Sequence, residues 1–202
     1  MILDQKVGIF ILRRNGEIMR KTPIVINLTG APGAGKSTGA AKLFCELKML
    51  GINCELVGEF AKDKTWEHNK TALGCQEYVF GKQSYRLARC RDEVEVIITD
   101  SPLPLTLIYN YNADIAKPLE DLVMAIYNSY ENINFFINRT KPYNPKGRNQ
   151  TAEESDALSK TIKELYDRLG IQYTEITGDA EGYAKAIQVI LDKYIYKNER
   201  GL

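Results

Sequence analysis

The sequence predicts an α/β fold in which a five-stranded parallel sheet lies between two layers of helices. Short apolar runs, most of them rich in β-branched residues, alternate with segments whose apolar residues recur at helical spacing. A glycine-rich phosphate-binding motif directly follows the first run. The chain has 202 residues, 44% of them hydrophobic, which suits one domain with a sizeable core. The predicted strands are residues 24–28, 53–57, 94–99, 133–137 and 171–176.

The first predicted strand runs into the segment GAPGAGKST, which meets the P-loop pattern G-x-x-x-x-G-K-[ST]. Glycines let successive backbone N–H groups turn toward an anion, and the lysine reaches the outer phosphates. The following helix would add the positive end of its dipole beneath them. A glycine-rich turn without a ligand is the alternative, but strand, motif and helix agree on a three-layer α/β/α P-loop NTPase fold that binds ATP. The predicted ATP-binding residues in the loop are Gly30, Ala31, Gly33, Ala34, Gly35, Lys36, Ser37 and Thr38.

Apolar residues at helical spacing predict helices over residues 40–50 and 158–169, each stopped by the glycine that follows. Thr151 and Glu154 form a capping box that would open the second helix. A last helix over residues 183–191 closes the domain.

Residues 1–22 fall outside this scheme. An apolar run from Val7 to Leu12, followed by Asn15 and Gly16, fits a strand whose Asn-Gly hairpin pairs at the sheet edge. The alternative is an extension that the fold does not need, and the sequence leaves both readings open. The α/β domain itself is expected over residues 23–202.

Ligands of open α/β sheets bind at the carboxyl ends of the strands, so polar residues just past each strand are the candidate site. After the second strand, Glu59 is placed to take a proton from a substrate hydroxyl as a general base. Trp66, the only tryptophan, is placed to stack on a flat ring. A solvated loop glutamate and a hydrophobic plug over the sheet end are the respective alternatives.

Asp100 follows the third strand at the Walker B position. Together with Ser37 it would hold a magnesium ion, or it would orient the attacking hydroxyl. A turn residue at a strand end is the alternative. A P-loop requires a metal partner, which favours the functional role.

Segment 139–150, after the fourth strand, gathers four cations around proline and glycine. Such a loop can close over phosphates, and an arginine supplied on closure stabilises the transferring phosphoryl group. A solvated basic loop is the alternative. Because the segment leaves from the P-loop edge, we expect a lid with Arg139 and Arg148 as catalytic arginines. After the fifth strand, Asp179 would either border the adenine of ATP or cap the next helix.

Taken together, these motifs resemble the P-loop kinases of small molecules. The chain is most similar to ribosylnicotinamide kinase domains and to related small P-loop ATPases, many of them from bacteriophages. The resemblance implies an ATP- and magnesium-dependent kinase over most of positions 24–195. The residues that carry it are the P-loop, Glu59 to Lys62, Gln83, Asp100 and the stretch from Arg148 to Glu154.

A looser resemblance links the chain to deoxynucleoside kinases. In that family a glutamate after the second strand is the base, a tryptophan follows it, and a helix glutamine reads the nucleobase. The resemblance implies that Glu59, Trp66 and Gln83 bind the acceptor. Ser101 stands where those kinases carry an arginine, so the resemblance indicates the reaction class rather than the substrate.

Composition excludes several other classes. A net charge of +1 gives no general basic field, so duplex nucleic acid is not an expected partner. The four cysteines lack C-x-x-C spacing and, with one histidine, make a poor zinc site. No apolar run approaches the ~20 residues of a membrane span, and we expect a cytoplasmic protein. A homodimer is left open.

A regulatory GTPase would need the motifs N-K-x-D and D-x-x-G, whereas this chain offers NRTK and DSPL at those places. We therefore predict an ATP- and magnesium-dependent kinase. It would move the γ-phosphoryl group to a hydroxyl or phosphate of a nucleoside-like or nucleotide-like small molecule, with either Glu59 or Asp100 as base. The alternative is a P-loop ATPase that acts in a DNA-associated or assembly role without a small-molecule acceptor. The predicted catalytic residues are Lys36, Glu59, Asp100, Arg139 and Arg148.

Overall fold

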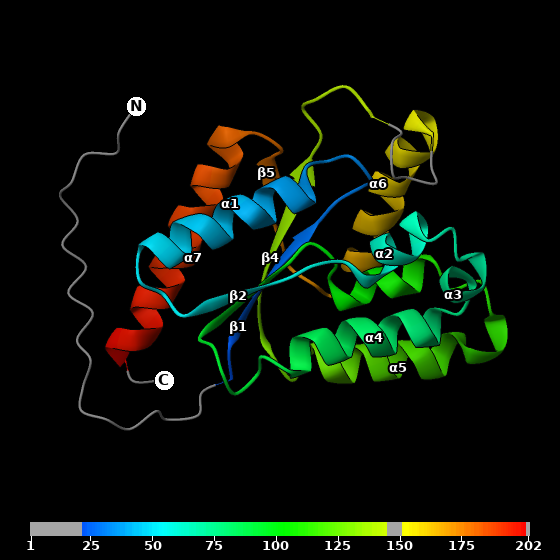
Figure 1. Ribbon diagram of the computed structural model, residues 1–202, viewed down its shortest axis with the longest axis horizontal. Helices are drawn as coiled ribbons and strands as arrows, with labels where there is room; N and C mark the ends of the chain where they lie inside the picture. Colours follow the sequence, from blue (N-terminus) through cyan, green and yellow to red (C-terminus); the bar gives the residue numbers. More distant parts are fainter. Residues whose placement is uncertain (1–21, 145–150, 201–202) are drawn as a thin grey trace.

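The protein contains a parallel five-stranded sheet in the order β2-β3-β1-β4-β5, which confirms the predicted fold class (Figure 1). The computed structural model describes residues 22–144 and 151–200. Residues 1–21, for which either a hairpin or an extension is predicted, and residues 145–150, which include Arg148, therefore lie outside the described residues. The strands are β1 (Ile24–Thr29), β2 (Cys54–Val57), β3 (Val96–Thr99), β4 (Glu131–Asn138) and β5 (Thr174–Thr177). The α-helices are α1 (Lys36–Met49), α2 (Phe60–Trp66), α3 (Lys70–Gly74), α4 (Gln76–Ala88), α5 (Ala116–Tyr127), α6 (Ala152–Arg168) and α7 (Ala180–Arg200), and the 3-10 helices are η1 (Leu103–Ile108) and η2 (Ala113–Ile115).

Helices cover both faces of the sheet because alternate residues of each central strand point to opposite sides. Ile24 and Ile26 of β1 pack with α1 and α7, which lie side by side in Figure 1. Val25, between them, packs against α4 and α5 on the other face, where Phe136 of β4 contacts α5 and α6. Within the described ranges no helix is long and apolar enough to cross a membrane.

Glycines end α1 and α6, as predicted from the sequence. Gly51 and Gly170 have φ angles of 78° and 67°, the left-handed region that favours glycine. After α6, the Ile171 N–H bonds to the Tyr166 carbonyl at 2.9 Å and the Gly170 N–H to the Asp167 carbonyl at 3.1 Å. This pair of bonds is the Schellman arrangement. The capping box of Thr151 and Glu154 is also confirmed at the start of α6.

The same turn explains why β5 begins three residues later than predicted. The sequence places the strand at residues 171–176, but β5 spans Thr174–Thr177. The N–H of Ile171 already bonds to α6, and its side chain is buried in the apolar cluster beneath that helix. The hydrophobic run therefore starts as a helix cap and becomes a strand only afterwards.

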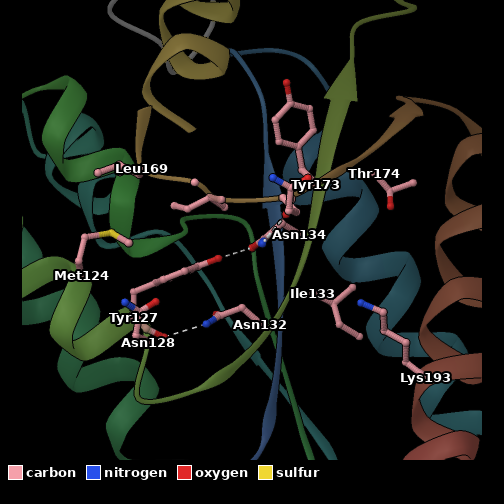
Figure 2. Close-up of a pocket in the computed structure, with 13 residues that line it drawn as sticks. Met124, Tyr127, Asn128, Asn132, Ile133, Asn134, Leu169, Tyr173, Thr174 and Lys193 are labelled. Carbon is pink, nitrogen blue, oxygen red and sulfur yellow. Dashed lines mark hydrogen bonds between the residues drawn. The ribbon is translucent and has the colours of Figure 1, made fainter. Parts of the chain in front are cut away.

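A network of side-chain amides joins β1, β4 and the segment that precedes β5. Asn27 of β1 donates to Asn132 at 2.8 Å, and Asn134 accepts from the Tyr127 hydroxyl at 2.9 Å and donates to the Gln172 carbonyl at 2.9 Å. Figure 2 shows this region, where a cavity of about 410 Å³ opens between the ends of α5 and α6. The network ties β4 to its neighbours and lies outside the cleft of the P-loop.

Candidate functional site

The P-loop connects β1 to α1 in the conformation that phosphate binding requires. Gly30, Gly33 and Gly35 have φ angles of 141°, 82° and 107°, which side-chain-bearing residues rarely adopt. The Lys36 Nζ donates to the Gly30 carbonyl at 2.8 Å and to the Ala31 carbonyl at 3.1 Å. The lysine thus lies across the loop, and backbone amides at the start of a helix such as α1 are suited to hold an anion.

Segments far along the sequence contact the P-loop and fix its position. The Tyr183 hydroxyl of α7 donates to the Gly35 carbonyl at 2.9 Å, and its ring leaves no room for a Cβ at Gly39, which would lie 2.7 Å away. Ser155, fully buried on α6, donates to the Pro32 carbonyl at 2.7 Å. A Cβ on Gly178 would lie 2.2 Å from the Ala34 carbonyl oxygen.

We expect Gly178→Ala to weaken ATP binding, because the new methyl must push the Ala34 carbonyl and with it the P-loop. Overpacking of this kind costs about 1–3 kcal/mol of folding free energy. Thermal denaturation with and without Mg-ATP would measure both effects. Gly81→Ala is the control, since a Cβ there meets nothing within 4 Å; if both variants bound ATP alike, the packing of Gly178 would not shape the P-loop.

One cleft of about 550 Å³ brings most of the predicted site together at the carboxyl ends of the strands. The P-loop forms one wall, and the segments after β2 and β3 form the opposite one. Volumes of this size are typical of small-molecule sites. Its functional lining includes Gly30, Pro32, Gly33, Ala34, Gly35, Lys36, Ser37, Thr38, Glu59, Lys62, Trp66, Asp100, Tyr109, Tyr111 and Lys141.

Glu59 is an electrostatically unusual residue in this cleft. Burial raises the pKa of its carboxyl above the ordinary range, although the charge of Lys36 opposes the shift, and Asp100 raises it further. Burial raises the pKa of Tyr109 to about 12, and the negative charge of Glu59 contributes to the increase. Its phenol therefore stays protonated near neutral pH and can donate a hydrogen bond. A carboxyl with a raised pKa in a cleft is suited to proton transfer.

Asp100 is suited to a metal ion. It is only 6% exposed, and its Oδ1 atom is buried without a hydrogen-bond partner among the described residues. An unsatisfied buried carboxylate oxygen beside a P-loop serine fits Mg²⁺, which takes oxygen ligands and binds through few carboxylates together with phosphates. Among the residues that the structure describes, no group of three or more His, Cys, Asp or Glu side chains could hold a metal ion.

Aromatic side chains form the outer part of the cleft. Trp66 is 60% exposed and Tyr111 is 89% exposed, and both line the cavity. The alternative of a tryptophan plugging the sheet end is thus not what the structure shows. Exposed rings at the rim of a polar cleft offer stacking surfaces for a flat ligand.

Four predicted residues that the structure describes do not line the cleft, and one of them, Ala31, is buried within the P-loop. Gln83 is buried, and its amide bonds to the chain around Glu59 and Asp100 instead of facing a ligand. Arg139 pairs with Asp156 and lies over the ring of Tyr143. Asp179 accepts from the Gly182 N–H at 3.0 Å, which is the helix-cap alternative. Gln83 and Arg139 thus have partners within the protein that the sequence did not reveal.

Other lining residues were not among the predicted ones. Tyr109 and Tyr111 follow η1 in the segment YNYN, nine or more residues beyond the end of β3, so a search limited to strand ends passes over them. Lys62 and Lys141 were recognised only as part of charged loops, yet both line the cavity. The only sign of these two tyrosines in the sequence was the polar, aromatic segment YNYN at residues 109–112.

Comparison with known proteins agrees with this geometry. The sequence model of a family described as an AAA domain matches residues 25–182. A crystal structure of the NadR protein in complex with NR superposes with a TM-score of 0.66 at 16% identity, covering 86% of this chain and 52% of that one. The chain thus spans about half the length of the NadR protein. The Mycobacterium tuberculosis APS kinase CysC, as a mutant, matches with a TM-score of 0.38 at 19% identity over 73% of this chain and 99% of that one. No curated protein matches the chain.

Proposed function

This chain belongs to the AAA-domain family of P-loop proteins, and from that premise we propose that it is an ATP- and magnesium-dependent kinase. Its acceptor would be a nucleoside-like or nucleotide-like small molecule with a flat ring. The domain would comprise residues 23–202, with residues 139–150 as its lid.

A single observation carries the proposal. The P-loop, the two carboxylates Glu59 and Asp100, and the exposed ring of Trp66 line the same cleft. A protein that only hydrolyses ATP can use a carboxylate to orient the attacking water, but it has no need of an exposed aromatic side chain in the same cleft. A kinase needs both, because it must deprotonate and orient a second molecule.

The chemistry follows from the positions of these groups. Lys36 and the P-loop amides would hold the β- and γ-phosphates, and Ser37 with Asp100 would hold Mg²⁺, which supplies charge neutralisation when bound. Glu59 would accept the proton of the acceptor hydroxyl as the new O–P bond forms and the bond from the γ-phosphorus to ADP breaks. Arg139 and Arg148 remain candidates to stabilise the moving group, provided that Arg139 exchanges its contact with Asp156 for the phosphate.

The outer cleft favours a ring-bearing acceptor. Trp66 and Tyr111 supply stacking faces, and Lys62 and Lys141 supply positive charge near the same cavity. Stacking depends little on which flat ring is bound. We therefore expect the protein to select acceptors that carry a flat ring more strongly than it discriminates between bases. The NR ligand of the NadR structure belongs to this class of molecule and is the first acceptor to try.

The decisive experiment measures ADP release with Mg-ATP alone and with nucleosides, deoxynucleoside monophosphates, ribosylnicotinamide or single-stranded DNA. We expect one small acceptor to raise the rate and to gain a phosphate detectable by mass spectrometry. A rate that no acceptor changes, or that only DNA stimulates, would support the DNA-associated or assembly ATPase instead. The Trp66→Ala variant should raise the KM for the acceptor while leaving the KM for ATP unchanged.

A further inference from the structure

Gln83 lies in the interior of the protein between the two loops that carry the carboxylates. We propose that Gln83 is a positioning residue, which fixes Glu59 and Asp100 relative to each other through bonds to the backbone and side chain next to each. The role rests on the proposed kinase function, in which both carboxylates act on one phosphoryl transfer.

The hydrogen bonds to the Glu59 loop set the orientation of the Gln83 amide. The Phe60 N–H can only donate, so the atom 2.9 Å from it is the amide oxygen of Gln83. The amide nitrogen then donates to the Gly58 carbonyl at 3.3 Å. Gly58 and Phe60 flank Glu59, so one side chain holds the backbone on both sides of the proposed base.

The same amide nitrogen lies 3.4 Å from the Thr99 Oγ1 on the last residue of β3. That hydroxyl oxygen also accepts the Ser101 N–H at 3.1 Å. Thr99 and Ser101 flank Asp100, as Gly58 and Phe60 flank Glu59. The chain of contacts therefore links both carboxylate loops through one buried glutamine, which is 4% exposed.

A neighbouring residue on α4 reinforces the link to the Glu59 loop. Arg86 donates to the Gly58 carbonyl at 3.1 Å, pairs with Asp63 at 2.5 Å, and lies over the ring of Phe60. Gln83 and Arg86 are three residues apart and so share one face of the helix. Arg86 contacts only the Glu59 side, and Gln83 alone reaches Thr99 among the hydrogen bonds described for this helix.

Such a link matters because the two carboxylates repel each other. The charge of Asp100 raises the pKa of Glu59, so the two groups are close enough to interact electrostatically. Repulsion favours a wider separation unless the loops are held, and a displacement of about 1 Å at a reacting group can cost on the order of 10²-fold in rate.

The test compares Gln83→Leu with Asn134→Leu. Asn134 is a matched control: it is a buried amide that joins two segments (Figure 2), and it does not line the cleft of the P-loop. We expect both variants to lower the melting temperature, but only Gln83→Leu to lower kcat by about 10²-fold with the KM for ATP unchanged. Equal losses of kcat in the two variants would overturn the proposal.

Amide hydrogen exchange provides a readout that does not depend on activity. In Gln83→Leu the amides of Phe60 and Ser101 should exchange faster than in the control, and unchanged exchange would also overturn the proposal. If the wild-type protein phosphorylates no acceptor, the kinase function fails while this measurement still decides the role of Gln83. Should Gln83→Leu not fold, Gln83→Glu keeps an acceptor for the Phe60 N–H but has no N–H to donate to the Gly58 carbonyl or the Thr99 hydroxyl. In that variant kcat should still fall while Phe60 exchanges as in the wild type, and an unchanged kcat would overturn the proposal.

Discussion

Replacing Lys36 with alanine should lower the rate of ATP turnover by on the order of 10³-fold. The Lys36 Nζ lies across the P-loop, 2.8 Å from the Gly30 carbonyl, and is the charge best placed to meet the outer phosphates. The variant should also lose the rise in melting temperature that Mg-ATP gives the wild-type protein, because a ligand stabilises only the folded state it binds.

Lys42→Ala is the matched control for this prediction. Lys42 lies on the same helix, pairs with Glu46 on the surface, and does not line the cleft. Its removal should leave turnover within about twofold, since surface ion pairs contribute little. Persistent turnover in Lys36→Ala would place the ATP site elsewhere.

Glu59→Gln should lower the rate of phosphoryl transfer by about 10²- to 10⁴-fold, the range expected for loss of a general base. The wild-type rate should fall as the pH drops through the raised pKa of Glu59, because the base must be unprotonated to act. The variant should lack that acid limb in its pH–rate profile. If Asp100 is the base instead, the limb will remain in Glu59→Gln and disappear in Asp100→Asn.

The same substitution should stabilise the protein against unfolding. A carboxyl whose pKa is raised by folding binds more protons in the folded state, so stability falls as the pH rises through the folded-state pKa. Glutamine removes this penalty, and the melting temperature of Glu59→Gln should exceed that of the wild type above this pH. Glu55→Gln on β2, outside the cleft, should show neither the rate loss nor the gain in stability.

The fold was predictable because its signals are local. The alternation of apolar runs with helical spacing gave all five strands, and the glycines at the ends of α1 and α6 gave their last turns. The late start of β5 was not predictable from hydrophobicity. The apolar side chain of Ile171 belongs to the turn that ends α6 and not to the strand. An apolar residue is equally compatible with a helix end and with a buried strand, so the sequence alone does not distinguish them.

The candidate site was predictable only where a motif or a strand end placed a residue. The P-loop, Glu59, Trp66 and Asp100 line one cleft as expected. The positions of the other predicted residues depend on contacts between segments far apart in the sequence. Arg139 forms an ion pair with Asp156, and Gln83 bonds to the backbone next to Glu59. Tyr109 reaches the cleft from a connection whose path no periodicity describes.

The contacts of Tyr183 and Gly178 with the P-loop link nucleotide binding to the docking of a segment that follows much later in the sequence. The bond from Tyr183 to Gly35 joins residues 148 positions apart, and Gly178 packs behind the same loop. A nascent chain that has emerged as far as β4 already carries the entire phosphate-binding motif but lacks the segments that brace it. Affinity for ATP would therefore arise only after α7 has docked, and the nucleotide would favour chains in which this helix is in place.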